Sequence, residues 1–133
     1  MNGKINGKGK NYYNGKLEFE GEYKEGERNG KGKEYDDNLI FDGEYLNGKR
    51  WNGKGKKYDY KGELIFEGEY INGKINGKEY YNGELEFEGE YINTRNIDIL
   101  RNGKGKEYHN DIIIFDGIYL YNKRLKGKEY INK

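Results

Sequence analysis

The sequence predicts an all-β protein: a single-layer antiparallel sheet of repeated β-hairpins. Three observations lead to this fold class. A seven-residue string that alternates Leu, Phe, Gly and Tyr with mostly acidic residues occurs five times, a lysine- and glycine-rich string recurs after the copies, and Asn-Gly pairs stand between strand-like runs. Strict alternation with aromatic residues is typical of a strand buried on one face. Asn-Gly favours the positive φ angles of a tight hairpin turn.

The first string fixes the repeat length. It reads LEFEGEY, LIFDGEY, LIFEGEY, LEFEGEY and IIFDGIY, at residues 17–23, 39–45, 64–70, 85–91 and 113–119. Its phenylalanines stand at 19, 41, 66, 87 and 115, so the steps are 22, 25, 21 and 28 residues. A step of this size holds two short strands and two turns, and such internal repetition is typical of an array of identical structural units.

The protein is therefore expected to form one domain over residues 1–133. Its parts are a leading half repeat at 1–13 and repeats at about 17–35, 39–58, 64–80, 85–108 and 112–131. One leading strand and five hairpins give eleven strands, which at about 4.8 Å per strand make a sheet roughly 50 Å long. Essentially no helix is expected. Two-residue turns are predicted at Asn14-Gly15, Asn47-Gly48, Asn72-Gly73 and Asn82-Gly83.

The register of the first repeat follows from a two-residue turn at Glu25-Gly26, which places Lys24 opposite Glu27. Counting outward pairs the residues Glu20 with Lys31, Glu18 with Lys33, Gly21 with Gly30, and Phe19 with Gly32. This puts opposite charges on one face and an aromatic ring over glycine on the other. Tyr12 and Tyr35 hold equivalent positions of the repeat, but on regular strands Tyr12 would lie on the aromatic face and Tyr35 on the opposite face. A bulge is therefore expected near the Gly-Lys-Gly segment.

Composition argues against catalysis. The protein has no Cys and no Ser, its only Thr is Thr94, and its only His is His109, so thiol and hydroxyl nucleophiles are nearly absent. The acidic runs recur in four of five copies, whereas an active site is formed once; a solvated face with lysine partners is expected instead. We therefore expect no enzyme, no cofactor and no metal site. A formal net charge of +1 gives no global attraction to nucleic acid.

The pattern F-x-G-x-Y-x-x-G-x-x-N-G-x-G, intact from Phe19 to Gly32, resembles the membrane occupation and recognition nexus (MORN) repeat. The resemblance runs over the whole sequence. It implies an elongated, twisted antiparallel sheet with interaction roles. Proteins of this family are commonly scaffolds at cytoskeletal or membrane structures, some are implicated in phospholipid binding, and antitoxin-like bacterial relatives have similar repeats.

The resulting functional prediction is a non-catalytic interaction and scaffold module, which presents a curved sheet with an aromatic groove to a protein partner. One alternative is a peripheral membrane adaptor that binds anionic headgroups through Lys31, Lys33, Lys54, Lys56, Lys104 and Lys106; another is an antitoxin-like repeat protein. The polar start, without an apolar run, predicts a cytoplasmic protein, with a membrane or the cytoskeleton as its place of action. The predicted partner-binding residues are Phe19, Tyr23, Phe41, Tyr45, Phe66, Tyr70, Phe87, Tyr91, Phe115, Tyr119, Ile112, Ile114, Ile118 and Leu120.

Two features break the repeat. The first is an insertion at residues 93–101, which would form a surface loop or a partner contact. The second is the last repeat, where Ile118 replaces the Glu of the other copies and shares its parity with Ile112, Ile114 and Leu120. An aliphatic stripe near a sheet edge is usually covered. We therefore predict a homodimer through the C-terminal hairpin, with association through the leading strand and a longer repeat array as the alternatives.

Overall fold

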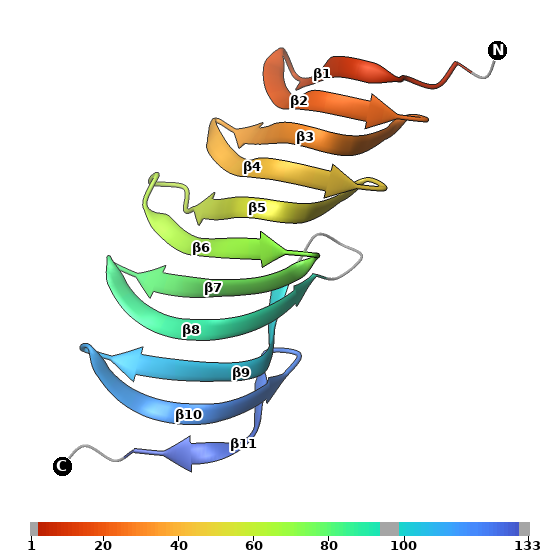
Figure 1. The fold of residues 1–133 in the computed structure, drawn as a ribbon. Coiled ribbons are helices and arrows are strands. Elements are labelled where there is room, and N and C mark those ends of the chain that lie inside the picture. Colours follow the sequence, from red (N-terminus) through yellow and green to blue (C-terminus); the bar gives the residue numbers. More distant parts are fainter. Residues whose placement is uncertain (1–2, 94–98, 131–133) are drawn as a thin grey trace. The chain divides into compact units, whose positions relative to one another are not determined.

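The computed structural model describes residues 3–93 and 99–130, and all regular structure in these residues is β (Figure 1). No helix in this part of the protein has the length and apolar character needed to cross a membrane. The strands are β1 Gly7–Tyr13, β2 Lys16–Lys24, β3 Glu27–Asp36, β4 Asn38–Leu46, β5 Lys49–Tyr58, β6 Leu64–Ile71, β7 Lys74–Tyr81, β8 Glu84–Asn93, β9 Ile99–His109, β10 Ile112–Leu120 and β11 Lys123–Glu129.

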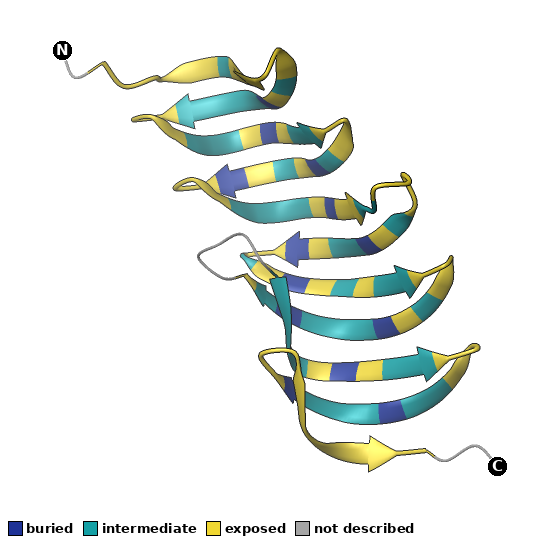
Figure 2. Cartoon of the chain, turned by 180° about the vertical axis from the view of Figure 1, so that it is seen from behind, coloured by how far each residue is buried: buried dark blue, intermediate teal, exposed yellow. Residues whose placement is uncertain are grey.

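These strands form one open antiparallel sheet in which each strand pairs with its neighbours in sequence, and this confirms the predicted fold class. The protein divides into two compact units. The first comprises Met1–Lys56 with Glu69–Gly73, and the second comprises Lys57–Gly68 with Lys74–Lys133. The single domain predicted over residues 1–133 stays a prediction. Figure 2 shows the buried residues spaced along the strands of each unit, while β11 is exposed throughout.

The first unit confirms the predicted end of the first hairpin and corrects its register. Lys24 lies opposite Glu27, as predicted. Beyond Tyr23 the prediction is wrong: the observed pairs are Gly21 with Gly32, Glu20 with Lys33, and Phe19 with Glu34. The physical reason is a bulge of two extra residues on β3, where Gly30 adopts a φ of 93°. The bulge predicted near the Gly-Lys-Gly segment is thus present.

A second register shift falls between Glu34 and Tyr35 in the pairing of β3 with β4. It resolves the conflict over the parity of this tyrosine. The hydroxyl of Tyr35 donates to Glu20 Oε1 at 2.9 Å, so the side chain belongs to the charged face and not to the aromatic one. Tyr12 lies opposite Leu17, as expected from the Asn14-Gly15 turn.

The turns of the first unit form two different edges. On one edge each turn hydrogen-bonds to the preceding hairpin. The Gly26, Gly48 and Gly73 amides donate to the carbonyls of Ile5, Arg28 and Trp51, each at 2.9 Å. Beside them, the side-chain oxygens of Asn6, Asn29 and Asn52 accept from the amides of Glu25, Asn47 and Asn72. We call this side of the sheet, where the strands end in these turns, the docked edge. The Asn14-Gly15 turn lies on the opposite edge.

The second unit repeats the pattern with one departure. Its buried apolar residues are Phe66, Ile75, Phe87, Tyr91, Phe115 and Tyr119. An arginine stands two residues after the turn at Arg28, Arg50 and Arg124, whereas Ile75 holds this position after Asn72-Gly73. Ile75 is fully buried opposite Tyr91, so an aliphatic side chain replaces the guanidinium in this one repeat.

Candidate functional site

A row of glycines crosses the strands of the first unit. Gly9, Gly21, Gly32 and Gly43 lie directly opposite one another on β1 to β4. A Cβ atom added at Gly21 would lie 2.5 Å from the carbonyl oxygen of Lys31, and one at Gly43 would lie 2.0 Å from that of Asn52. Only glycine allows the neighbouring strands to approach this closely.

A groove of about 970 Å³ follows this glycine row. The glycines form its floor, and the residues that flank each glycine in sequence form its two walls. Because successive side chains of a strand point to opposite faces, both walls belong to the charged face of the sheet. The wall residues are Lys8, Lys10, Glu20, Glu22, Lys31, Lys33, Asp42 and Glu44.

The charges in this groove change sign from strand to strand. β1 contributes two lysines, β2 two glutamates, β3 two lysines, and β4 one aspartate and one glutamate. In the part of the protein that the structure describes, none of the ion pairs involves a wall lysine. Their ammonium groups are therefore open to a ligand.

The opposite face of the same strands holds the aromatic core. Phe19 makes edge-to-face contacts with Tyr23 and Tyr45, with ring centroids 5.4 and 5.2 Å apart, and Arg28 lies over its ring at 4.2 Å. Edge-to-face rings and a cation over a ring face are both attractive arrangements. An arginine likewise covers each of Phe41, Phe87 and Phe115, and the three arginines are Arg50, Arg101 and Arg124.

A glutamate then ties each arginine to a core tyrosine. In the first unit, Glu34 accepts hydrogen bonds from the Tyr45 hydroxyl and from two nitrogens of Arg50. Burial alone would raise the pKa of Glu34, but the hydrogen bond and charge of Arg50, followed by the Tyr45 hydroxyl, lower it below its usual value. The partly buried core polar groups are thus paired, which avoids the cost of a buried unpaired charge.

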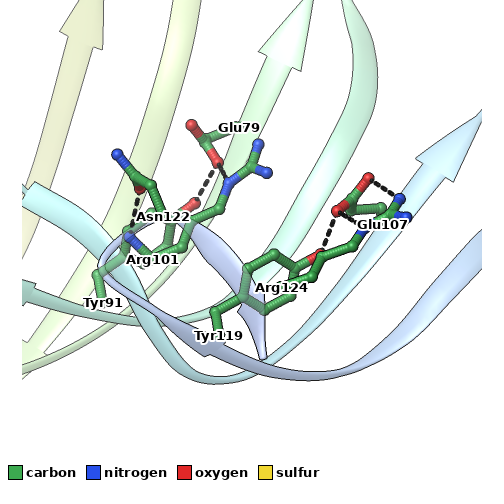
Figure 3. A network of polar contacts seen from close by, with 7 residues as sticks. All are labelled: Glu79, Tyr91, Arg101, Glu107, Tyr119, Asn122 and Arg124. Atoms are coloured by element: carbon green, nitrogen blue, oxygen red, sulfur yellow. Dashed lines mark hydrogen bonds and ion pairs between the residues drawn. The ribbon is translucent and has the colours of Figure 1, made fainter. Parts of the chain in front are cut away.

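Figure 3 shows two such networks in the second unit. Glu79 accepts from Arg101 Nε at 2.5 Å and from the Tyr91 hydroxyl at 3.0 Å. Glu107 accepts from the Tyr119 hydroxyl and from two nitrogens of Arg124. The unit of the repeat is therefore a phenylalanine covered by an arginine, with a glutamate that pairs the arginine and a tyrosine.

Comparison with known proteins agrees with this geometry. The family model for the MORN repeat matches residues 19–38 and 66–78. The protein is a MORN-repeat protein. A comparison with curated proteins and with solved structures finds no match. MORN repeats are generally protein- or membrane-interaction modules and are typically non-catalytic.

The aromatic residues predicted to bind a partner lie in the core of the MORN repeats. Nine of the ten have exposed fractions of 4% or less, and Tyr23 is half-buried. Their own edge-to-face contacts and the arginines above them occupy the predicted aromatic groove. A role for these residues in binding stays a prediction, and in the structure they pack against one another in the core.

The other predicted residues are more accessible. Ile112 and Leu120 are each 45% exposed, and Ile114 and Ile118 are half-buried. Lys31 and Lys33 line the groove, whereas Lys104 and Lys106 belong to the second unit. Of the insertion at 93–101, residues 94–98 lie outside the described residues. Within the described residues there is no cluster of His, Cys, Asp and Glu that could hold a metal ion.

The sequence prediction missed two sets of residues that hold the repeats together. The first set is the covering arginines: Arg28, Arg50 and Arg124 share a position two residues after a turn, whereas Arg101 ends the insertion. The second set is the asparagines of the Asn-Gly-Lys string, at Asn29, Asn52 and Asn102, whose side chains accept from the amides of the next docked turn. These asparagines look like turn residues in the sequence, but they lie within strands and join consecutive repeats.

Tyrosine hydrogen bonds on the charged face predict a loss of stability at alkaline pH. Burial, followed by the hydrogen bond to Glu67, raises the pKa of Tyr80 to about 12. Burial, followed by the hydrogen bond to Glu88, raises the pKa of Tyr108 to about 12. An unfolded tyrosine ionises near pH 10, so between about pH 10 and 12 only the unfolded protein has released these protons. The stability that these groups contribute is complete below about pH 10 and is lost as pH rises.

Urea unfolding at a series of alkaline pH values measures this effect. The midpoint is expected to fall through this window, and to fall less in a variant that carries Tyr80→Phe and Tyr108→Phe. An equal fall in both proteins would assign the effect to other groups, such as the lysines.

Proposed function

We propose that this MORN-repeat protein is a non-catalytic interaction module, and that a protein partner binds in the groove along the glycine row. The observation that carries the proposal is the strand-by-strand change of sign along the groove walls, with lysines that have no ion-pair partner among the described residues. Such a surface recognises a ligand by the pattern of its charges.

The charge pattern favours a protein partner over a partner of uniform charge, such as an anionic membrane or a nucleic acid. The walls carry four lysines and four acidic residues, so their net charge is 4 − 4 = 0. Adjacent strands lie about 4.8 Å apart, which is less than the screening length of about 8 Å at physiological ionic strength. An anionic membrane or a nucleic acid therefore meets attraction and repulsion together. A polypeptide that carries both signs can place each of its charges opposite the matching strand.

The spacing of the charges favours a helical segment as the occupant. Along an α-helix, residues three apart are separated by about 4.5 Å along the axis, close to the spacing of about 4.8 Å between strands. A helix lying along the groove with acidic and basic residues alternating at i, i+3, i+7 and i+10 keeps these side chains on one face. Their axial span of about 15 Å is close to the ~14.4 Å across four strands, so each residue would lie opposite one strand. An extended segment repeats its side chains on one face every ~6.8 Å, which does not match.

The test uses two synthetic helical peptides of identical composition. One alternates Glu and Lys at i, i+3, i+7 and i+10 on one face, and the other separates the same residues into an acidic half and a basic half. Fluorescence anisotropy at low and high salt is expected to show salt-sensitive binding of the alternating peptide alone. Equal binding of both peptides, or of neither, would contradict the proposal.

Matched variants locate the binding site in the groove. Neutralising Lys31 and Lys33 to Gln removes two wall charges and is expected to weaken binding of the alternating peptide about 2- to 30-fold, since an exposed ion pair contributes about 0.2–1 kcal/mol. The control replaces Lys24 and Lys49, which are exposed in the same unit but outside the groove, and should leave affinity unchanged. An equal loss in both variants would indicate a general charge effect.

One observation favours the alternative of a peripheral membrane adaptor. In the second unit Ile118 lies opposite Lys104 on one side and Lys126 on the other, so an aliphatic side chain stands between two cations where the other repeats have a glutamate. Anionic headgroups would suit this combination. Sedimentation with vesicles that contain phosphatidylserine tests it, and binding lost on changing Lys104 and Lys126 to Gln would support the membrane function.

The same observation bears on the proposed homodimer through the C-terminal hairpin. A symmetric contact centred on Ile118 would bring the flanking lysines of two copies together, which opposes association at low salt. Sedimentation equilibrium measures the outcome. A monomer at tens of micromolar in both low and high salt, unchanged by Ile118→Glu, would contradict the dimer.

A further inference from the structure

Four Asn-Gly turns of this protein have nearly the same backbone conformation. The φ angles are 50° and 77° at Asn14-Gly15, 49° and 84° at Asn47-Gly48, 49° and 81° at Asn72-Gly73, and 50° and 80° at Asn82-Gly83. Two residues with positive φ define the type I′ hairpin turn in each case. A difference in chemical reactivity among these four turns would therefore not arise from the φ angles of the turn.

The surroundings separate the turns into two pairs. At Asn47-Gly48 and Asn72-Gly73, on the docked edge, the glycine N–H donates to a backbone carbonyl of the preceding hairpin at 2.9 Å. The asparagine N–H of each pair donates to an asparagine side chain, at 3.2 and 2.9 Å. Trp51 also covers Gly73, because a Cβ added there would lie 2.9 Å from the indole.

The turns at Asn14-Gly15 and Asn82-Gly83 have none of these contacts. A Cβ added at Gly15 or Gly83 would meet no atom within 4 Å. Among the described residues, no backbone hydrogen bond outside the strand ladders has either glycine amide as its donor. Both asparagines are exposed. The glycine nitrogen and the asparagine side chain are therefore both free to react and to move.

We propose that Asn14 and Asn82 are sites of spontaneous deamidation in the folded protein, and that docking protects Asn47 and Asn72. The glycine backbone nitrogen attacks Cγ of the preceding asparagine, and a new bond forms between these two atoms. The bond between Cγ and the asparagine amide nitrogen Nδ2 breaks, and Nδ2 leaves as ammonia with the proton that the glycine amide gives up. Water then opens the cyclic succinimide at one of its two carbonyls and produces either aspartate or isoaspartate.

Glycine favours this reaction because it has no side chain to hinder the approach of its own nitrogen. Asparagine is among the thermolabile residues. Docking opposes the reaction because the attacking nitrogen would first have to give up its hydrogen bond. Each conversion adds one negative charge, so modification of both sites changes the formal net charge from +1 to 1 − 2 = −1. The modified protein is therefore acidic where the original is slightly basic.

The experiment follows all four sites in the full-length protein. The folded protein is incubated in mildly alkaline buffer, samples are digested, and the peptides that contain each turn are quantified by mass spectrometry. Deamidation at Asn14 and Asn82 is expected to be about tenfold or more faster than at Asn47 and Asn72, since the loss of one hydrogen bond of about 1.4 kcal/mol corresponds to tenfold. In urea, where the protein is unfolded, the four rates should converge.

A variant tests the role of docking directly. Asn29→Ala removes the side chain that accepts from the Asn47 amide, which loosens the docked turn and with it the hydrogen bond from the attacking Gly48 nitrogen to the Arg28 carbonyl. Deamidation at Asn47 is therefore expected to accelerate while the rate at Asn72 stays unchanged. The proposal is overturned if the four folded-state rates are equal, if Asn47 or Asn72 reacts faster than Asn14 and Asn82, or if the difference persists in urea, where sequence alone would explain it.

Discussion

Phe41→Ala is expected to lower the free energy of unfolding by about 3–5 kcal/mol, the usual range for truncation of a buried phenylalanine. Phe41 has no exposed surface. Its ring makes edge-to-face contacts with Tyr45 and Tyr70 at 5.3 and 5.2 Å and lies 4.7 Å beneath the Arg50 guanidinium. The truncation therefore leaves a cavity and also removes the ring that both tyrosines and the arginine contact.

Urea denaturation followed by tyrosine fluorescence measures the loss. The control is Leu46→Ala on the same strand, where the side chain is 40% exposed and a loss below about 1 kcal/mol is expected. If Phe41→Ala were no more destabilising than this control, the phenylalanine would not be part of the core. Because each repeat packs mainly on its neighbours, local loss of protection in hydrogen exchange is expected around β4.

Gly43→Ala is expected to cost about 3 kcal/mol or more, at the upper end of the range for overpacking. The added Cβ would lie 2.0 Å from the Asn52 carbonyl oxygen and 2.6 Å from Gly53 Cα. Both are backbone atoms of the adjacent strand, so relief requires the two strands to separate. The cost arises from lack of space, because Gly43 is not among the residues with positive φ.

A second glycine of the same row provides the matched control. A Cβ at Gly9 would meet two side chains and no backbone atom within 4 Å, namely the ring edge of Tyr23 at 3.0 Å and Ile5 Cγ2 at 4.0 Å, and Gly9 likewise has no positive φ. Because a tyrosine ring can rotate away where a backbone is fixed by its ladder, Gly9→Ala should cost less than about 1 kcal/mol. Thermal unfolding of both variants compares them, and equal melting temperatures would refute the role assigned to the glycine row.

The sequence by itself determined the strands, the turns and the family. Alternation in the LEFEGEY string has a period of two, which places Phe19 and Tyr23 on one face without any tertiary information. The Asn-Gly pairs specify positive φ locally, so turns such as Asn82-Gly83 could be predicted from the dipeptide alone. These features depend on short-range sterics and recur in every repeat, and both the predicted fold class and the family are confirmed.

The tertiary structure alone decided the register and the site. The bulge at Gly30 shifts the pairing of Phe19 from Gly32 to Glu34, because the length of a bulge depends on the fit between two strands and not on either strand alone. That shift brings Gly21 opposite Gly32 and so creates the glycine row that forms the groove floor. It also places Glu34 within reach of Tyr45 and Arg50, which lie 11 and 16 residues away in sequence. Such contacts are long-range, and alternation within a single strand carries no information about them.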